Sequence, residues 1–295
     1  MRITTQMIVD SAIRQMQQNH RNLFEAQEAV SSGRSFSKPS QNPIGAEREM
    51  KLVSLLDRLD QFDRSVTSGT SFLQESERAL SQVFELLSQA KDLALTQVTA
   101  TADSVSRDIA SQEVGSLLRQ LLSEANTRQG DRFIFGGFET GSEPFDLAGT
   151  YSGDSGSIAI RIGPPNDTLN INFTGDKVFN GTGGGVDLFQ TLTDLQTALS
   201  NNDTNGINLA IEQLDQGIDQ TVSFQAQAGI RLNRLEVARN RLADTRLQLT
   251  EQLAENSGAD LAQVAANLAN QQTLFETSLA ATAQVLRISF LSFLS

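Results

Sequence analysis

Apolar residues seven positions apart recur in four stretches of this chain, and this spacing limits what the chain can fold into. The longest run falls between residues 52 and 94, where every seventh residue is apolar. Seven residues make close to two helical turns, so such a ladder lies along one side of a helix and packs against another helix. The residues of this ladder are Leu52, Leu59, Val66, Leu73, Leu80, Leu87 and Ala94.

A second ladder of the same length predicts the partner of this helix. It runs from Ile207 to Leu249 in steps of seven, and Thr221 is its one polar member. We therefore expect a long helix over about 45–98 and a second long helix that returns antiparallel to it. Shorter periodic stretches predict helices at about 105–128 and 187–200, with Ser104 or Ser106 as the cap of the former.

Both ends of the chain carry the same period. Near the N-terminus Val9, Met16, Leu23 and Val30 form one ladder, and a second ladder beside it, Ile13, His20 and Gln27, is half polar. Near the C-terminus the stretch 259–294 contains neither Gly nor Pro. Two terminal helices with matching stripes can pair as a coiled coil and bring the chain ends together. The residues predicted to form an assembly interface are Val9, Ile13, Met16, Leu23, Val30, Leu261, Leu268, Phe275, Leu279, Leu286, Phe290 and Phe293.

The terminal helices are not expected to be stable by themselves. Ordering a backbone costs roughly 1–2 kcal/mol per residue, while full burial of a large apolar side chain returns about 1.5–3 kcal/mol. Burial of the dozen or so large apolar side chains offsets the free-energy cost of ordering both segments only if neighbouring subunits bury additional apolar surface of these helices. We therefore predict ends that are loose in the monomer and ordered in a polymer. A buried core helix is the alternative interpretation of a single stripe.

Two breaks separate these terminal helices from the long ones. Residues 31–43 contain two prolines, one glycine and five serines, and Ser257-Gly258 marks the second break. The first break is predicted to be an extended connection with Phe36 and Ile44 buried beneath it.

Composition changes sharply between Gly130 and Gly185, which hold thirteen of the 21 glycines and three of the five prolines. Residues 157–162 and 168–173 are apolar at every second position, the pattern of half-buried strands. The predicted fold is mainly α with a small inserted β domain. It has a terminal coiled-coil domain (1–44 with 256–295), a helical bundle core (45–144 with 187–255) and a β-rich outer domain (145–186).

The composition speaks against several classes of function. A net charge of −12 disfavours binding to nucleic acid or to an anionic membrane surface. Cysteine is absent, and the one histidine, His20, lies on a helix stripe, so neither a thiolate site nor a Ser-His-Asp triad is expected. The acidic residues are scattered along helix faces, which disfavours a metal site. We expect no enzyme activity, no cofactor and no metal.

Membrane insertion is not expected either. The most apolar run, residues 285–294, is too short to cross a bilayer and contains Arg287. Residues 1–10 lack the apolar segment of a cleavable signal peptide. The glycine-rich run 181–185 has no following Lys-Ser/Thr, so it is not a phosphate-binding loop.

Several stretches resemble the flagellin-type proteins of the bacterial flagellum. Ala29-Val-Ser-Ser-Gly-Arg-Ser35 with Pro39-Ser-Gln-Asn-Pro-Ile-Gly-Ala46 is similar to the break of that family, although Gln41-Asn42 replaces the usual acidic pair. Residues 228–236 resemble the motif on its returning helix, and residues 286–294 resemble its tail. Phe133-Ile-Phe-Gly-Gly-Phe-Glu-Thr140, Pro144-Phe145 and Tyr151-Ser-Gly-Asp154 are similar to the β-domain signature of the hook–filament junction members.

The resemblance implies a structural adaptor that is exported unfolded and joins the hook to the filament outside the cell. Its implied partners are further copies of itself in a ring of a helical tube, an adjacent hook-associated junction protein, the flagellin filament and a cytosolic export chaperone. One alternative is a flagellin subunit with a minimal outer domain. Another, from a different class, is a coiled-coil protein with a ligand-binding β domain.

Overall fold

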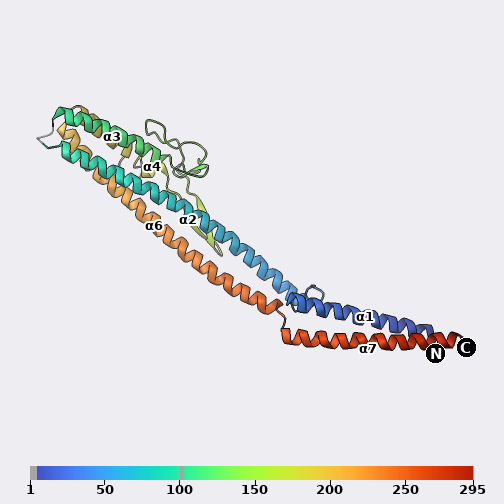
Figure 1. Ribbon diagram of the computed structural model, residues 1–295. Coiled ribbons are helices and arrows are strands. Elements are labelled where there is room, and N and C mark those ends of the chain that lie inside the picture. The colour runs from blue at the N-terminus through green and yellow to red at the C-terminus, as the bar shows by residue number, and fades with distance from the viewer. Residues whose placement is uncertain (1–4, 100–102, 295) are drawn as a thin grey trace. The chain divides into compact units, whose positions relative to one another are not determined.

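The computed structural model describes residues 5–99 and 103–294, with the side chains of 5, 6, 285 and 288–294 outside the description. Most of the described chain is helical: α1 (Thr5–Ser32), α2 (Pro43–Gln97), α3 (Ser104–Ala125), α5 (Leu188–Ser200), α6 (Thr204–Ser257) and α7 (Leu261–Leu294) (Figure 1). A single-turn helix, α4 (Gly175–Val178), and two short hairpins lie between α3 and α5. The predicted fold class, mainly α with a small β insert, is confirmed.

The chain forms two compact units. One comprises residues 1–58 with 245–295 and holds α1, α7 and the adjoining ends of α2 and α6. The other comprises residues 59–244 and holds the rest of those long helices and everything between them. The finer division predicted from the sequence, with an outer domain at 145–186, stays a prediction.

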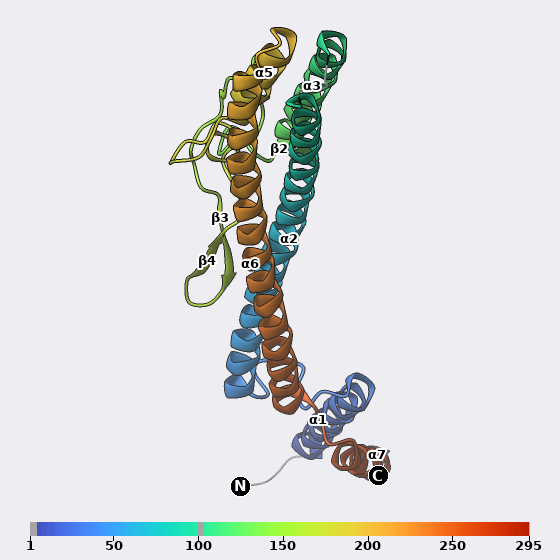
Figure 2. The same ribbon diagram turned by 90° about the vertical axis from the view of Figure 1, so that its left-hand side faces the viewer.

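The core of the 59–244 unit is built on the two long ladders. Val66, Leu73 and Leu80 of α2 are 0% exposed, as are Leu214 and Leu235 of α6. Figure 2 shows the two helices side by side, and Lys91 of α2 forms an ion pair with Asp215 of α6. Helix α3 packs against α5 in the same unit. Both long helices bury residues beside their ladders as well, among them Val83 and Ala90 of α2 and Ala210 of α6, so each is held along a broad apolar face.

The start of α3 corrects one prediction. The cap is Asp103 rather than Ser104 or Ser106, and its Oδ1 accepts a 2.8 Å hydrogen bond from the backbone N–H of Ser106. This bond lowers the pKa of Asp103 from its ordinary value. A carboxylate at this position also has the favourable sign for the positive end of the helix dipole.

The insert contains little regular strand. Hairpin β1 (Arg128–Gln129) with β2 (Arg132–Phe133) precedes the predicted start of the β domain. Hairpin β3 (Ala159–Gly163) with β4 (Asp167–Asn170) matches the two alternating runs, with Ile160 opposite Leu169. The apolar residues Ile162, Leu169, Ile171 and Phe173 of those runs are buried as expected, whereas Ile158 and Ile160 are half-buried and the polar Asn172 is buried as well.

Aromatic rings fill the rest of the insert. The Phe145 ring lies 5.2 Å, between centroids, from each of the Tyr151, Phe179 and Phe189 rings. The Tyr151 hydroxyl donates to the backbone oxygens of Asp154, at 2.7 Å, and Phe135. Burial, together with the nearby carboxylate of Asp176, raises the pKa of Tyr151 to about 12. The insert is therefore held by a ring cluster and by polar side chains that bond its backbone, such as Tyr151 and the buried Asn172, rather than by a large sheet.

Polar side chains of α6 attach the insert to the helices. The guanidinium of Arg231 lies 4.1 Å above the Phe173 ring and donates to the backbone oxygen of Asn172. Arg234 forms a 2.7 Å ion pair with Asp167 at the tip of the hairpin. The amide of Gln220 accepts from the N–H of Val186 and donates to the carbonyl of Val178.

A gap in the apolar pattern of α2 has a structural cause. Gly69 interrupts the second stripe of that helix, and a Cβ there would lie 2.4 Å from Cδ1 of Ile160. The hairpin side chains Ile160 and Ile171 occupy the space next to this glycine. The missing side chain thus marks where the insert packs on α2.

Replacing Leu80 by Ala should lower the free energy of unfolding of the 59–244 unit by about 2–5 kcal/mol, because a fully buried side chain leaves a cavity. Leu95→Ala is the control, since Leu95 lies on the same helix and in the same unit but is 44% exposed. Urea unfolding followed by circular dichroism measures both. Equal losses in the two variants would contradict the proposed core.

The insert should lose stability in alkali through Tyr151. Its folded pKa, about 12, lies above the ordinary value of 10, so folding favours the neutral phenol. The stabilisation is complete below pH 10 and is lost as the pH rises from 10 through 12, by about 1 kcal/mol after allowance for its partial exposure. Tyr151 is the one tyrosine and tryptophan is absent, so tyrosinate absorbance measures the titration directly. Tyr151→Phe should remove this part of the pH dependence.

Candidate assembly interface

The terminal helices meet along the predicted stripes. Helices α1 and α7 lie side by side and antiparallel within the 1–58 and 245–295 unit (Figure 1). The ring of His20 packs on the ring of Phe275, with centroids 5.4 Å apart. His20 is thus a residue of the helix pair, as its place on the stripe indicates. The half-buried members of the predicted set are Val9, Ile13, Met16, Leu23, Leu268 and Phe275.

The remaining members of the predicted set are exposed in the single chain. Val30 is 37% exposed, Leu261 64%, Leu279 50% and Leu286 44%. By contrast, the ladder residues of the 59–244 unit are at or near 0%. Phe290 and Phe293 lie in α7, but their side chains fall outside the described residues. Their role in an interface, like that of the set as a whole, stays a prediction.

Four further large apolar residues of the terminal helices are exposed and were not in the predicted set. Met7 is 60% exposed, Ile8 47%, Phe24 60% and Leu274 51%. Ile8, Phe24 and Leu274 each stand beside a ladder residue in the sequence, so a search for a period of seven passes over them. The sequence signal that could have found them is a large apolar side chain at any position of a predicted terminal helix.

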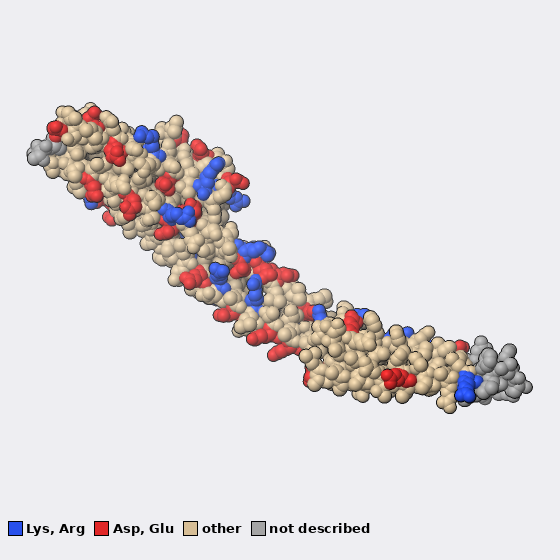
Figure 3. Space-filling view, in the orientation of Figure 1, with Lys and Arg blue, Asp and Glu red and all other residues tan. Residues whose placement is uncertain are grey.

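The C-terminal helix carries few charges. Among the 34 residues of α7, Glu276 and Arg287 alone are charged. Figure 3 shows few coloured side chains over the terminal helices in that view and many over the 59–244 unit. A surface of this kind associates through apolar contact and close packing rather than through ion pairs.

The two chain breaks are joined by their backbones. The N–H of Ser35 donates to the carbonyl of Ser257 at 2.8 Å, and the N–H of Ala259 donates to the carbonyl of Gly33 at 2.9 Å. Arg34 and Gly258 form an antiparallel bridge between these two bonds. We call residues 33–35 and 257–259 the clasp, because the connection after α1 and the connection before α7 cannot move independently while it is formed.

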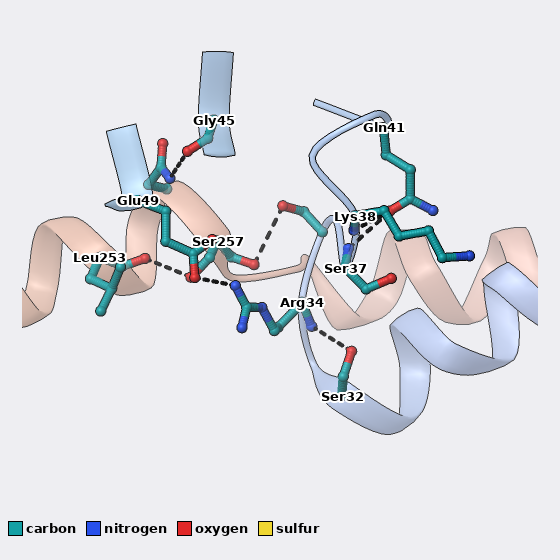
Figure 4. A network of polar contacts seen from close by, with 11 residues as sticks. Ser32, Arg34, Ser37, Lys38, Gln41, Gly45, Glu49, Leu253 and Ser257 are labelled. Carbon is teal, nitrogen blue, oxygen red and sulfur yellow. Dashed lines mark hydrogen bonds and ion pairs between the residues drawn. The ribbon is translucent and has the colours of Figure 1, made fainter. Parts of the chain in front are cut away.

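Side chains around the clasp fasten it to the first turns of α2 (Figure 4). Arg34 forms an ion pair with Glu49, and the amide of Asn256 donates to the carbonyl of Gly45 at 2.9 Å. Phe36 is buried below the connection, as predicted. The prediction for Ile44 is wrong, since it is 82% exposed. The Phe36 ring instead packs on Gly45, where a Cβ would lie 2.9 Å from its Cε1 atom.

The Gln41-Asn42 pair, which departs from the pattern of the flagellin-type break, has a definite role. Oε1 of Gln41 accepts from the N–H groups of Ser37 and Lys38. Oδ1 of Asn42 accepts a 2.9 Å bond from the N–H of Gly45 at the start of α2. The amides therefore satisfy backbone donors that would otherwise lack partners, as capping side chains do.

No candidate metal centre is found in the part of the chain that the structure describes. There, no group of three or more His, Cys, Asp or Glu side chains is placed to hold a metal ion. The described helices also include none with the length and apolar content needed to cross a membrane.

Comparison with known families gives matches over both ends of the chain. The bacterial flagellin N-terminal helical region matches residues 3–140, and the bacterial flagellin C-terminal helical region matches residues 211–294. Both matches include a terminal helix, most or all of a long helix and the clasp residues between them.

Individual relatives match over most of their length. Flagellar hook-associated protein 3 of Escherichia coli is 26% identical over 94% of this chain and 95% of that protein. The protein of the same name in Salmonella typhimurium is 27% identical over 88% of this chain and 82% of its own length. A flagellin of Listeria monocytogenes is 22% identical over 96% of this chain and 95% of its own.

Solved structures share the fold. A hook-associated protein 3 from Legionella pneumophila superposes with a TM-score of 0.64 at 16% identity, covering 70% of this chain and 98% of that one. FlgL of Bacillus cereus gives 0.61 at 20% identity and covers 69% and 99%. At these identities the likeness establishes the fold.

The clasp yields a prediction. Ala259→Pro removes the N–H that donates to Gly33, so protection of the Ser35 amide against hydrogen exchange should fall about tenfold, which corresponds to the loss of one ordinary hydrogen bond. Ala259→Ser keeps the N–H and serves as the control. Unchanged protection of Ser35 in the proline variant would show that the two breaks are not coupled.

Proposed function

The chain belongs to the bacterial flagellin family, and from that premise we propose that it is the structural adaptor that joins the hook to the filament in the bacterial flagellum. The observation that carries this assignment is the match to hook-associated protein 3, which extends over nearly the whole of both chains. The sequence signature at 133–154 supports it, because its residues Phe133, Phe135 and Phe145 are buried in the core of the insert.

The terminal helices suit a tube subunit. Such a subunit needs helices that pack laterally into a wall, so its helix pair must leave apolar surface for its neighbours. Phe24, Leu261 and Leu279 provide that surface, since each is at least half exposed in the single chain. Burial of these side chains between copies would stabilise the terminal helices, and on this basis we predict that assembly orders them.

The proposed partners follow from this position. Further copies of the chain complete the ring, an adjacent hook-associated junction protein lies on one side, and flagellin lies on the other. We place the assembled protein outside the cell, at the hook–filament junction, after export of the unfolded chain with the help of a cytosolic chaperone. The absence of cysteine suits this route, because no disulfide has to be broken or formed.

We propose that the role is structural and involves no catalysis. The rival interpretation places a ligand site inside the β-rich insert. Its interior is instead filled by the rings of Phe135, Phe145, Phe179 and Phe189, each at most 5% exposed. Such packing favours a rigid outer module over a ligand cavity.

Deletion of the gene tests the assignment against a flagellin role. Loss of an adaptor should leave cells with hooks but without filaments, and with monomeric flagellin in the medium. Loss of a filament subunit should leave hooks and little secreted flagellin. Electron microscopy and immunoblotting of the medium give the measurement, and a plasmid-borne copy of the chain should restore filaments.

The same strain tests the C-terminal helix. Phe290→Asp or Phe293→Asp should prevent complementation, because a charge would enter an apolar interface without a partner. Circular dichroism should show the 45–255 core still folded in both variants. Full complementation by either variant would contradict an assembly role for this part of α7.

A further inference from the structure

The α1–α7 pair has two unlike flanks. On one flank, mostly small and uncharged residues of both helices line a groove of about 380 Å³. Ala12 and Asn19 line it from α1, and Leu274, Ala281 and Thr282 line it from α7. None of the described side chains that line this groove is charged. We call this side the groove flank.

The other flank carries bulk. Leu279 is two residues from Ala281, which places it about 200° around α7, and Phe24 is five residues from Asn19, about 140° around α1. Both therefore point away from the groove, and they are 50% and 60% exposed. The His20–Phe275 ring contact lies between the helices at this level. We call this side the ridge flank.

We propose that the ridge flank of one copy packs into the groove flank of the next copy around the ring. The inference rests on the proposed function, because it names which surfaces of the adaptor meet each other. Bulky apolar side chains fit beside alanine and threonine, and a groove without charged lining accepts them without desolvating an unpaired charge.

Geometry explains why unlike flanks, rather than like flanks, should meet. A contact between unlike surfaces leaves a ridge open at one end of a row of copies and a groove open at the other, so copies add until a ring or a helix results. A contact of ridge with ridge would instead close into a two-fold dimer and stop. The unlike flanks therefore match the arrangement that a tube wall requires.

Cysteine crosslinking tests the pairing, and the chain supplies a clean background because it has no cysteine. Leu279→Cys marks the ridge and Ala12→Cys marks the groove. Both full-length variants are expressed together in the deletion strain, and isolated flagella are treated with a short bis-maleimide. We expect crosslinked dimers in the mixture and none with either variant alone. Gln82→Cys, at an exposed position of α2 in the 59–244 unit and therefore outside both flanks, should give none with Leu279→Cys.

A charge pair gives an independent readout. Leu279→Lys alone and Ala281→Glu alone should each reduce the amount of chain in isolated flagella roughly tenfold or more, since each buries an unpaired charge. The double variant should recover most of it, because the ammonium introduced on the ridge of one copy would meet the carboxylate introduced in the groove of the next. Within one chain the two positions face opposite flanks, so rescue reports contact between copies.

Each outcome has a defined meaning. Dimers from Leu279→Cys alone, no dimers in the mixture, or a double charge variant no better than the worse single one would each overturn the flank pairing. If the unaltered chain fails to restore filaments to the deletion strain, the adaptor function itself fails. Complementation by the unaltered chain with the wrong crosslinks leaves the adaptor function standing and removes only the pairing.

Discussion

A pair of helices covers only one side of each helix, and this limit governs both units of the chain. In the 59–244 unit, α3, α5 and the insert are present besides α2 and α6, and the ladders become fully buried. In the other unit α1 and α7 have each other along most of their length, and stripe residues such as Leu261 and Leu279 remain exposed. The same heptad pattern thus produces a finished core in one place and an unfinished surface in the other. The difference lies in what surrounds each pair.

Periodic segments were the part of the fold that the sequence predicted well. The long ladders and the terminal stripes correspond to α2, α6, α1 and α7 within a few residues at each boundary. These segments could be predicted because the apolar period of a helix is visible within a short stretch of sequence. The paired runs at 157–162 and 168–173 became β3 and β4 for the same reason.

Features that depend on distant residues were not predictable in this way. The clasp joins main-chain atoms of Gly33 and Ser35 to those of Ala259 and Ser257. A pattern of side chains in the sequence does not predict such backbone hydrogen bonds. Ile44 was placed wrongly because the space next to Phe36 belongs to Gly45, a fact of packing rather than of hydrophobicity. In the same way Phe24 was missed, although its exposure on α1 makes it a principal part of the candidate interface.

The two halves of the clasp lie far apart in the sequence, and this separation has a consequence for truncated chains. Its bond from Ser35 to Ser257 spans 222 residues, so it can form only when most of the polypeptide has been made. A chain that ended before Ser257 would lack the second break and helix α7, so α1 would have no helix within its own chain to pack against. Only a polypeptide that extends through Ala259 can therefore join its two breaks.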